Sequence, residues 1–112
     1  MFKKILVALD HSKADKTLLP KVKDLARLTG AELLLLHVST GWAAEWRENL
    51  NLADTKEMKE DHDLLEKTGQ DLRNEGFQVN TFQGYGEPAH EILALARQRK
   101  CDLIAMTTHG TA

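Results

Sequence analysis

Two uninterrupted apolar runs constrain the fold of this chain more than any other feature of its sequence. One covers residues 5–9 and stops at Asp10, and the other covers residues 33–38 and is interrupted only by His37. Neither run alternates between apolar and polar residues, so both faces of each strand must be covered. The runs therefore predict two central strands of a parallel sheet that has helices packed on both faces.

Helical and strand patterns alternate along the rest of the chain. In chain order, the expected elements are a strand over residues 5–9, a helix that ends at 29–30, a strand over 33–38, a long loop over 39–53, a charged amphipathic helix over 54–75, an edge strand over 77–82, a turn over 84–86, a helix over 88–100 and a strand over 103–106. Ser12 is expected to cap the first helix, and Asp15 favours its first turn. Pro20 cannot donate a backbone hydrogen bond, so that helix either begins near Thr17 or is kinked. Gly69 counts slightly against the second helix.

The alternation of strands and helices also predicts the topology. Strands of this kind pair in parallel through right-handed crossovers, and the simplest arrangement has the strand order 3-2-1-4. The chain then changes direction across the sheet between the first and fourth strands. Open α/β sheets bind ligands at such a point, outside the carboxyl ends of the strands. Asp10 and residues 107–110 lie there, with His37 and Val38 on the next strand, so this edge of the sheet is the candidate site.

Composition and charge exclude several other classes of protein. The 112 residues are 42% hydrophobic and 29% charged, with a formal net charge of -2, and no basic stripe supports a nucleic-acid partner. The single cysteine, Cys101, excludes an internal disulfide framework and fits a reducing compartment. The apolar run near the N-terminus is too short for a signal peptide or a membrane span. We therefore expect a cytoplasmic protein with neither a nucleic-acid nor a membrane partner.

Four segments of the chain resemble universal stress proteins. They are KILVALDHS over residues 4–12, AELLLLHV over 31–38, GEP over 86–88 and CDLIAMTTHG over 101–110. The resemblance implies one universal stress protein domain over residues 1–112, with a Rossmann-like fold of the adenine nucleotide alpha hydrolase type. It also implies that the domain is incomplete at its C-terminus, because the family's fourth helix and fifth strand are absent. The family usually dimerises through that fifth strand, so we expect a homodimer, and we expect further residues or a partner chain to cover the apolar strand over residues 103–106.

The same resemblance implies a ligand, which is ATP or another adenine nucleotide, with or without Mg²⁺. The binding residues that it implies are Ala8, Asp10, His37, Val38, Met106, Thr107, Thr108, His109 and Gly110. In the family, the residue at Asp10 faces the adenosine, that at Val38 contacts the adenine through its backbone, and that at Met106 lines the base or ribose. A glycine loop after the fourth strand lets backbone N–H groups approach the phosphates closely.

Two departures from the family pattern leave two functions open. Thr107 occupies the place of the first glycine of that loop, and the sequence stops at Ala112, before the second Gly-Ser or Gly-Thr. The first function is regulation through ATP occupancy and dimerisation. The alternative is a dimeric universal stress protein that does not bind ATP and acts as a protein-interaction module. No convincing general base or catalytic lysine accompanies the site, so we expect no enzyme, or at most weak ATP hydrolysis.

Three histidines fall at the same end of the predicted sheet as Asp10. His11, His37 and His109, together with that carboxylate, could hold zinc. Their spacing matches no known ligand pattern, so we interpret them as polar residues at the rim of the site and expect no metal site.

Overall fold

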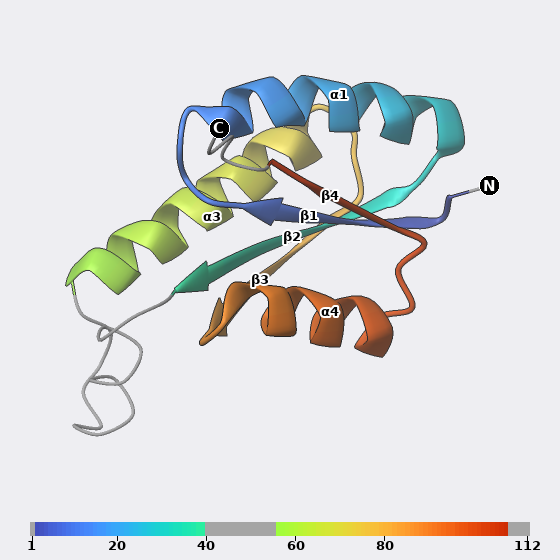
Figure 1. Cartoon of the computed structure of the whole chain (residues 1–112). Coiled ribbons are helices and arrows are strands. Elements are labelled where there is room, and N and C mark those ends of the chain that lie inside the picture. Colours follow the sequence, from blue (N-terminus) through green and yellow to red (C-terminus); the bar gives the residue numbers. More distant parts are fainter. Residues whose placement is uncertain (1, 40–55, 108–112) are drawn as a thin grey trace.

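The computed structural model describes residues 2–39 and 56–107 of the chain. The described elements are β1 (Lys4–Leu9), α1 (Ala14–Thr29), β2 (Glu32–Ser39), α3 (Lys56–Asn74), β3 (Val79–Tyr85), α4 (Pro88–Gln98) and β4 (Leu103–Met106). The strands form one parallel sheet in the order β3-β2-β1-β4, which confirms the predicted order (Figure 1). None of the described helices is both long enough and apolar enough to cross a membrane.

The helices cover both faces of this sheet, as the unbroken apolar runs require. Odd-numbered side chains such as Ile5, Val7 and Leu35 pack under α1 and α3, and all three are 0% exposed. Even-numbered side chains such as Leu6 and Leu34 face α4 on the other side. Because successive side chains of a strand point to opposite faces, the two runs supply both halves of the core.

Several boundaries differ from those expected from the sequence, and two of these differences have a clear physical reason. Helix α1 begins at Ala14 and includes Pro20, so of the two alternatives for this proline the later start near Thr17 is wrong. Pro20 is exposed, so water can satisfy the carbonyl group that it leaves without a donor. Strand β3 runs through Gly84 and Tyr85, which were expected to be in a turn, because β2 continues to Ser39 and offers them pairing partners.

Gly69 is needed for close packing of α3 on the sheet, although glycine has a low helix propensity. It lies where α3 crosses β3, and a Cβ atom at this position would be 2.7 Å from Cγ2 of Thr81. Real Cβ atoms do not come so close to other heavy atoms. The absence of a side chain at Gly69 therefore allows the helix to lie close to the strand.

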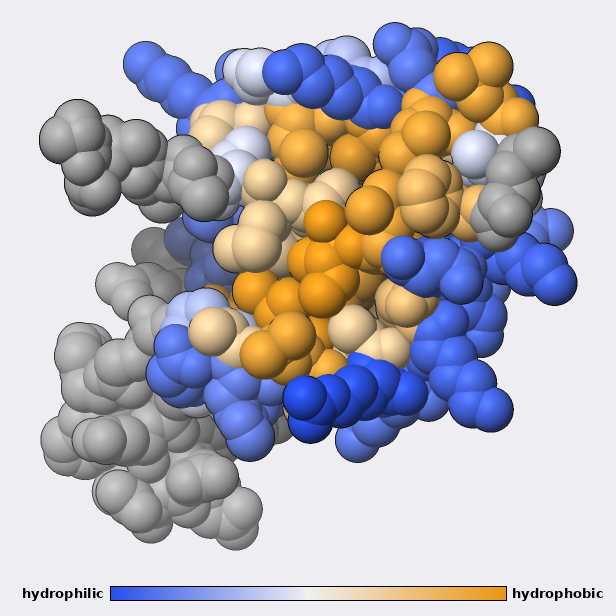
Figure 2. Space-filling view, turned by 45° about the vertical axis from the view of Figure 1, so that its right-hand side comes forward, coloured by the Kyte–Doolittle hydropathy of each residue, from blue (hydrophilic) through white to orange (hydrophobic). Residues whose placement is uncertain are grey.

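The outer edge of β4 is the least covered part of the sheet. Its side chains are only partly buried, and Met106 is 50% exposed. Figure 2 shows a broad hydrophobic surface on one side of the molecule, bordered by hydrophilic residues. No strand among residues 2–39 and 56–107 pairs with this outer edge, and the expected cover from further residues or a partner chain stays a prediction.

Asp102 fastens the beginning of β4 to the beginning of β1. Its Oδ2 atom accepts hydrogen bonds from the backbone N–H groups of Lys3, at 2.7 Å, and Lys4, at 2.9 Å. These hydrogen bonds favour the ionised carboxylate, so they lower the pKa of Asp102 below its ordinary value.

We expect Asp102→Ala to destabilise the protein at neutral pH and to matter less in acid. A carboxyl group whose pKa falls on folding stabilises the folded state above its ordinary pKa of 3.8, and this contribution is lost as the pH falls through the folded-state value. The difference in urea midpoint between wild type and Asp102→Ala should therefore shrink below pH 3.8. Asp24→Ala, which changes an exposed acid on α1, is the control and should leave the midpoint at neutral pH almost unchanged. A difference for Asp102→Ala that persists down to about pH 2.5 would contradict this account.

Candidate functional site

The carboxyl end of β1 leads into a hydrogen-bonded loop that begins at Asp10. The Oδ1 atom of Asp10 accepts hydrogen bonds from the backbone N–H of Ser12, at 2.9 Å, and from its hydroxyl group, at 2.6 Å. The Ser12 hydroxyl oxygen accepts in turn from the N–H of Ala14, at 3.1 Å, but the N-cap residue of α1 is Lys13, so the expected cap by Ser12 is wrong and its side chain instead orders the turn before the helix. The exposed Asp10 carboxylate is thereby tied to the amino-terminal end of a helix.

The buried carboxylate of Asp15 stabilises this loop through hydrogen bonds to its backbone. Its side chain is 9% exposed, and its carboxylate accepts hydrogen bonds from the backbone N–H of Asp10, at 3.2 Å, and of His11, at 2.9 Å. Burial raises the pKa of the Asp15 carboxyl above its ordinary value, and the two hydrogen bonds oppose that rise. His11 has a φ of 60°, a left-handed conformation that the bond to Asp15 helps to hold. Asp15 thus positions the loop, a role beyond that of an acid in the first helical turn.

The structure brings several of the predicted site residues to one edge of the sheet. Ala8, near the end of β1, is paired with Met106 of β4 on one side and with Leu36 of β2 on the other. The predicted residues that gather at this edge are Ala8, Asp10, His37, Val38, Met106 and Thr107. The other three predicted residues, Thr108, His109 and Gly110, lie outside the described part of the chain.

The side chains at this edge divide between the two faces of the sheet. Ala8 and Val38 pack with the cluster on the α4 face. Side-chain alternation puts Met106 on the same face as Ile104, which belongs to that cluster. His37 has the opposite orientation, because it alternates with Val38 along β2. Its backbone is at the predicted site, but its imidazole ring is on the face covered by α1 and α3.

There the His37 ring forms a compact polar group with His11 and Asp61. The rings of His11 and His37 are stacked, with centroids 3.9 Å apart and planes 5° from parallel. The Nδ1 atom of His11 is 3.4 Å from Oδ1 of Asp61 on α3. His37 is 8% exposed and the His11 side chain 9%, so both lie deeper than the rim positions that the sequence suggested.

The surroundings of His37 act on its protonation. Burial is the main cause that lowers the pKa of His37, and the positive charge of a protonated His11 lowers it further. The Nδ1 atom of His37 is 3.2 Å from the side-chain nitrogen of Gln83, which also donates a hydrogen bond to the Ser39 hydroxyl, at 3.0 Å. The ring is therefore held by a polar neighbour on β3.

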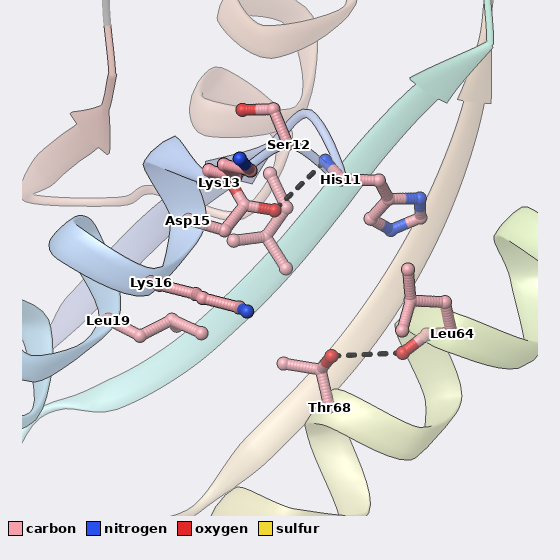
Figure 3. Close-up of a pocket in the computed structure, with 9 residues that line it drawn as sticks. His11, Ser12, Lys13, Asp15, Lys16, Leu19, Leu64 and Thr68 are labelled. Carbon is pink, nitrogen blue, oxygen red and sulfur yellow. Dashed lines mark hydrogen bonds between the residues drawn. The ribbon is translucent and has the colours of Figure 1, made fainter.

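A cavity of about 360 Å³ lies beside this group, between α1 and α3. Its lining residues are Leu9, His11, Ser12, Lys13, Asp15, Lys16, Leu19, Leu64 and Thr68. Figure 3 shows the His11 side chain extending from the loop toward α3, with the hydrogen bond from its backbone to Asp15. The cavity is thus on the face of the sheet opposite to Ala8 and Val38.

Comparison with known proteins identifies the family. The family model described as "Universal stress protein family" matches residues 1–112. The chain belongs to the universal stress protein family. This agrees with the resemblance of its strand ends, from the loop after β1 to the last residues of β4.

Individual family members match over nearly the whole chain. Universal stress protein YxiE of Bacillus subtilis is 32% identical over 120 residues, which cover 98% of this chain and 81% of that protein. Universal stress protein MJ0577 of Methanocaldococcus jannaschii is 28% identical over 127 residues, which cover 98% of this chain and 78% of that protein. The solved structure of MJ0577 superposes with a TM-score of 0.81 and covers 99% of this chain and 78% of that chain, at 30% identity.

A further solved structure shares the fold. It is a universal stress protein crystallised in complex with cAMP, and it superposes with a TM-score of 0.66 over 92% of this chain and 70% of that chain. Its sequence identity is 15%, so the likeness concerns the fold alone.

Asp61 and Gln83 are two polar residues near the site that the sequence did not single out. Asp61 belongs to a helix with many charged residues, and nothing in the helical pattern tells which acid faces the sheet. Gln83 lies at a position that was expected to follow an edge strand. The charge pattern alone gave no signal for either residue.

Proposed function

We propose that this universal stress protein binds an adenine nucleotide, ATP or a close relative, at the carboxyl ends of β1 and β4. The observation that carries the proposal is the strand order β3-β2-β1-β4, in which the chain changes direction across the sheet between these two strands. The exposed Asp10 carboxylate belongs to this edge and is held by Ser12. The cAMP complex of a protein with the same fold supports the view that this fold accommodates an adenine nucleotide.

The chemistry of the edge suits the parts of a nucleotide. Ala8, Val38 and Met106 offer apolar surface for the base, and Met106 is 50% exposed and so accessible. The Asp10 carboxylate can accept hydrogen bonds from ribose hydroxyl groups. The backbone N–H groups from Thr107 onward would meet the phosphates, with or without Mg²⁺. We propose that the protein works in the cytoplasm, as a homodimer, through nucleotide occupancy rather than rapid turnover.

The proposal is tested by titrating the protein with ATP and Mg²⁺ in a calorimeter. We expect saturable micromolar binding, and we expect Asp10→Ala to weaken it about tenfold or more, because hydrogen bonds to a charged group contribute about 1.5 to 3 kcal/mol each. Asp10→Asn keeps an oxygen that can accept from Ser12 and should weaken binding less than Asp10→Ala. Gly110→Val tests the phosphate end and should also weaken binding. Asp24→Ala is the matched control and should bind as the wild type does.

Two results would overturn the proposal. One is a folded wild-type protein that shows no saturable ATP binding. The other is an affinity that Asp10→Ala leaves unchanged while circular dichroism shows that the variant is folded, which would put the nucleotide elsewhere.

A specific observation favours the second candidate function, a dimeric interaction module that does not bind ATP. The outer edge of β4 is partly exposed and apolar, and Thr107 replaces a glycine at the start of the phosphate loop. A protein that is dimeric by analytical ultracentrifugation and does not bind ATP would favour this function. A monomer that binds ATP would exclude it.

A further inference from the structure

The group formed by His11, His37 and Asp61 has the composition of a metal site. Its three members come from three separate elements: the loop after β1, strand β2 and helix α3. One potential ligand atom from each residue lies within 4.8 Å of the other two. Two imidazoles and a carboxylate are the protein ligands that zinc and similar divalent transition metals prefer.

One ring nitrogen of this group has no hydrogen-bond partner in the described part of the chain, and a bound ion could interact with it. Among the side chains that the structure describes, the Nε2 atom of His11 is buried and has no hydrogen-bond partner. A buried polar atom of this kind is rare and calls for an explanation, which a bound ion can provide. The neighbouring ring has no such need at Nδ1, because the side-chain oxygen of Gln83 lies 3.4 Å from that atom of His37 and can accept its hydrogen.

The contact with Gln83 also orients the ring for an ion. Ligand histidines usually hold one ring nitrogen with a polar neighbour and offer the other to the metal. When Nδ1–H of His37 donates to Oε1 of Gln83, which lies 3.4 Å away, the lone pair of its Nε2 atom is left for the ion. Gln83 is itself fixed by its hydrogen bond to the Ser39 hydroxyl.

Coordination needs the two rings to turn as well as to approach, because planes only 5° from parallel do not direct both nitrogen lone pairs at one point. Ligand atoms around a tetrahedral zinc ion lie roughly 3.3 Å apart, so atoms now spread over 4.8 Å must approach one another by roughly 1.5 Å. Rotation of the two stacked rings about their side-chain bonds can supply this movement. The cavity between α1 and α3, which His11 also lines, gives the ion an entry path.

We propose that His11, His37 and Asp61 bind a divalent transition metal ion of the zinc type, with the fourth position open to water or a ligand. This site goes beyond the proposed nucleotide binding, because its side chains lie on the face of the sheet opposite to Ala8 and Val38. It also differs from the zinc site considered from the sequence, because Asp61 takes the place of Asp10 and His109 is not needed.

The test is a Zn²⁺ titration of the metal-free protein in the absence of nucleotide, with a competing chelator to measure affinity. We expect one Zn²⁺ per chain. His11→Ala, His37→Ala and Asp61→Asn should each weaken binding by at least about 100-fold, because loss of an outer-shell partner alone typically costs 10- to 100-fold. His62→Ala, next to Asp61 but exposed, and His90→Ala, exposed on α4, are the matched controls and should bind as the wild type does.

The visible absorption of bound Co²⁺ distinguishes direct coordination by Asp61 from a role in stability alone. Co²⁺ in a tetrahedral site with imidazole and carboxylate ligands absorbs visible light, so wild type should develop colour and Asp61→Asn should not. Asp61→Asn is nearly isosteric and lies at a partly exposed position of α3, so it remains informative if His11→Ala fails to fold. Asp10→Ala should bind Zn²⁺ normally, which separates this test from that of the nucleotide site. Binding that only the His62 or His90 variant abolishes, or no stoichiometric binding by the wild type, would overturn the proposal.

Discussion

Replacing Leu35 with alanine is expected to lower the free energy of unfolding by about 3 to 5 kcal/mol. Leu35 is 0% exposed and lies on the central strand β2, paired with Val7 of β1 and Thr81 of β3. Strands hydrogen-bonded on both sides cannot close over the space that the lost methyl groups leave. Since a whole domain is stable by only about 5 to 15 kcal/mol, this single change removes a large part of the total.

Urea unfolding followed by far-ultraviolet circular dichroism measures the effect of Leu35→Ala. The midpoint should fall while the slope of the transition stays nearly constant, because the surface exposed on unfolding hardly changes. Leu28→Ala is the matched control: Leu28 is 80% exposed on α1, and its replacement should change stability by no more than about 0.5 kcal/mol. Equal losses in the two variants would contradict the assignment of the core.

Replacing Gly69 with valine is expected to destabilise the protein by about 2 to 3 kcal/mol. Even a single Cβ atom at this position would lie 2.7 Å from Cγ2 of Thr81. Thr81 is not free to turn away, because it is β-branched and its hydroxyl group donates a hydrogen bond to Glu66. The helix must therefore move off the strand, which opens the core beneath α3. Thermal unfolding measures the loss.

A double-mutant cycle isolates this contact between α3 and β3. Alanine favours a helix over glycine by about 1 kcal/mol, so the gain in helix propensity offsets only part of what Gly69→Ala loses through the clash. Thr81→Ser removes Cγ2 but keeps the hydroxyl group. We expect Gly69→Ala to destabilise the wild type and to be neutral or stabilising in the Thr81→Ser background. The same effect in both backgrounds would show that the clash is not the cause.

The topology of the sheet could be predicted because it depends on patterns that are local in the sequence. The unbroken apolar runs around Leu6 and Leu34 identify central strands, and alternation with helices leaves few arrangements for the others. The boundaries were less predictable because they depend on partners in space. Tyr85 is in a strand because Ser39 lies opposite to it, and Pro20 is accommodated because it faces water.

The candidate site was predictable to the same extent. Asp10 and Met106 follow from the strand order, which brings the ends of β1 and β4 together. The orientation of the His37 ring, the position of Asp61 beside it and the burial of Asp15 could not be predicted. The ring face of His37 depends on the exact register of β2 against its neighbours, whereas the other two depend on how a helix is rotated against the sheet, and many exposed acids give the same sequence pattern.

The strand order also determines when the sheet can be completed in a growing polypeptide. β1 is synthesised first and gains its neighbour β2 soon afterwards, but its other edge pairs only with Leu103–Met106. While the intervening residues are being made, that edge of the nascent chain has unpaired N–H and C=O groups next to apolar side chains. Such an edge invites pairing with other chains, so we expect the nascent chain to be most prone to aggregation between the synthesis of the first and last strands.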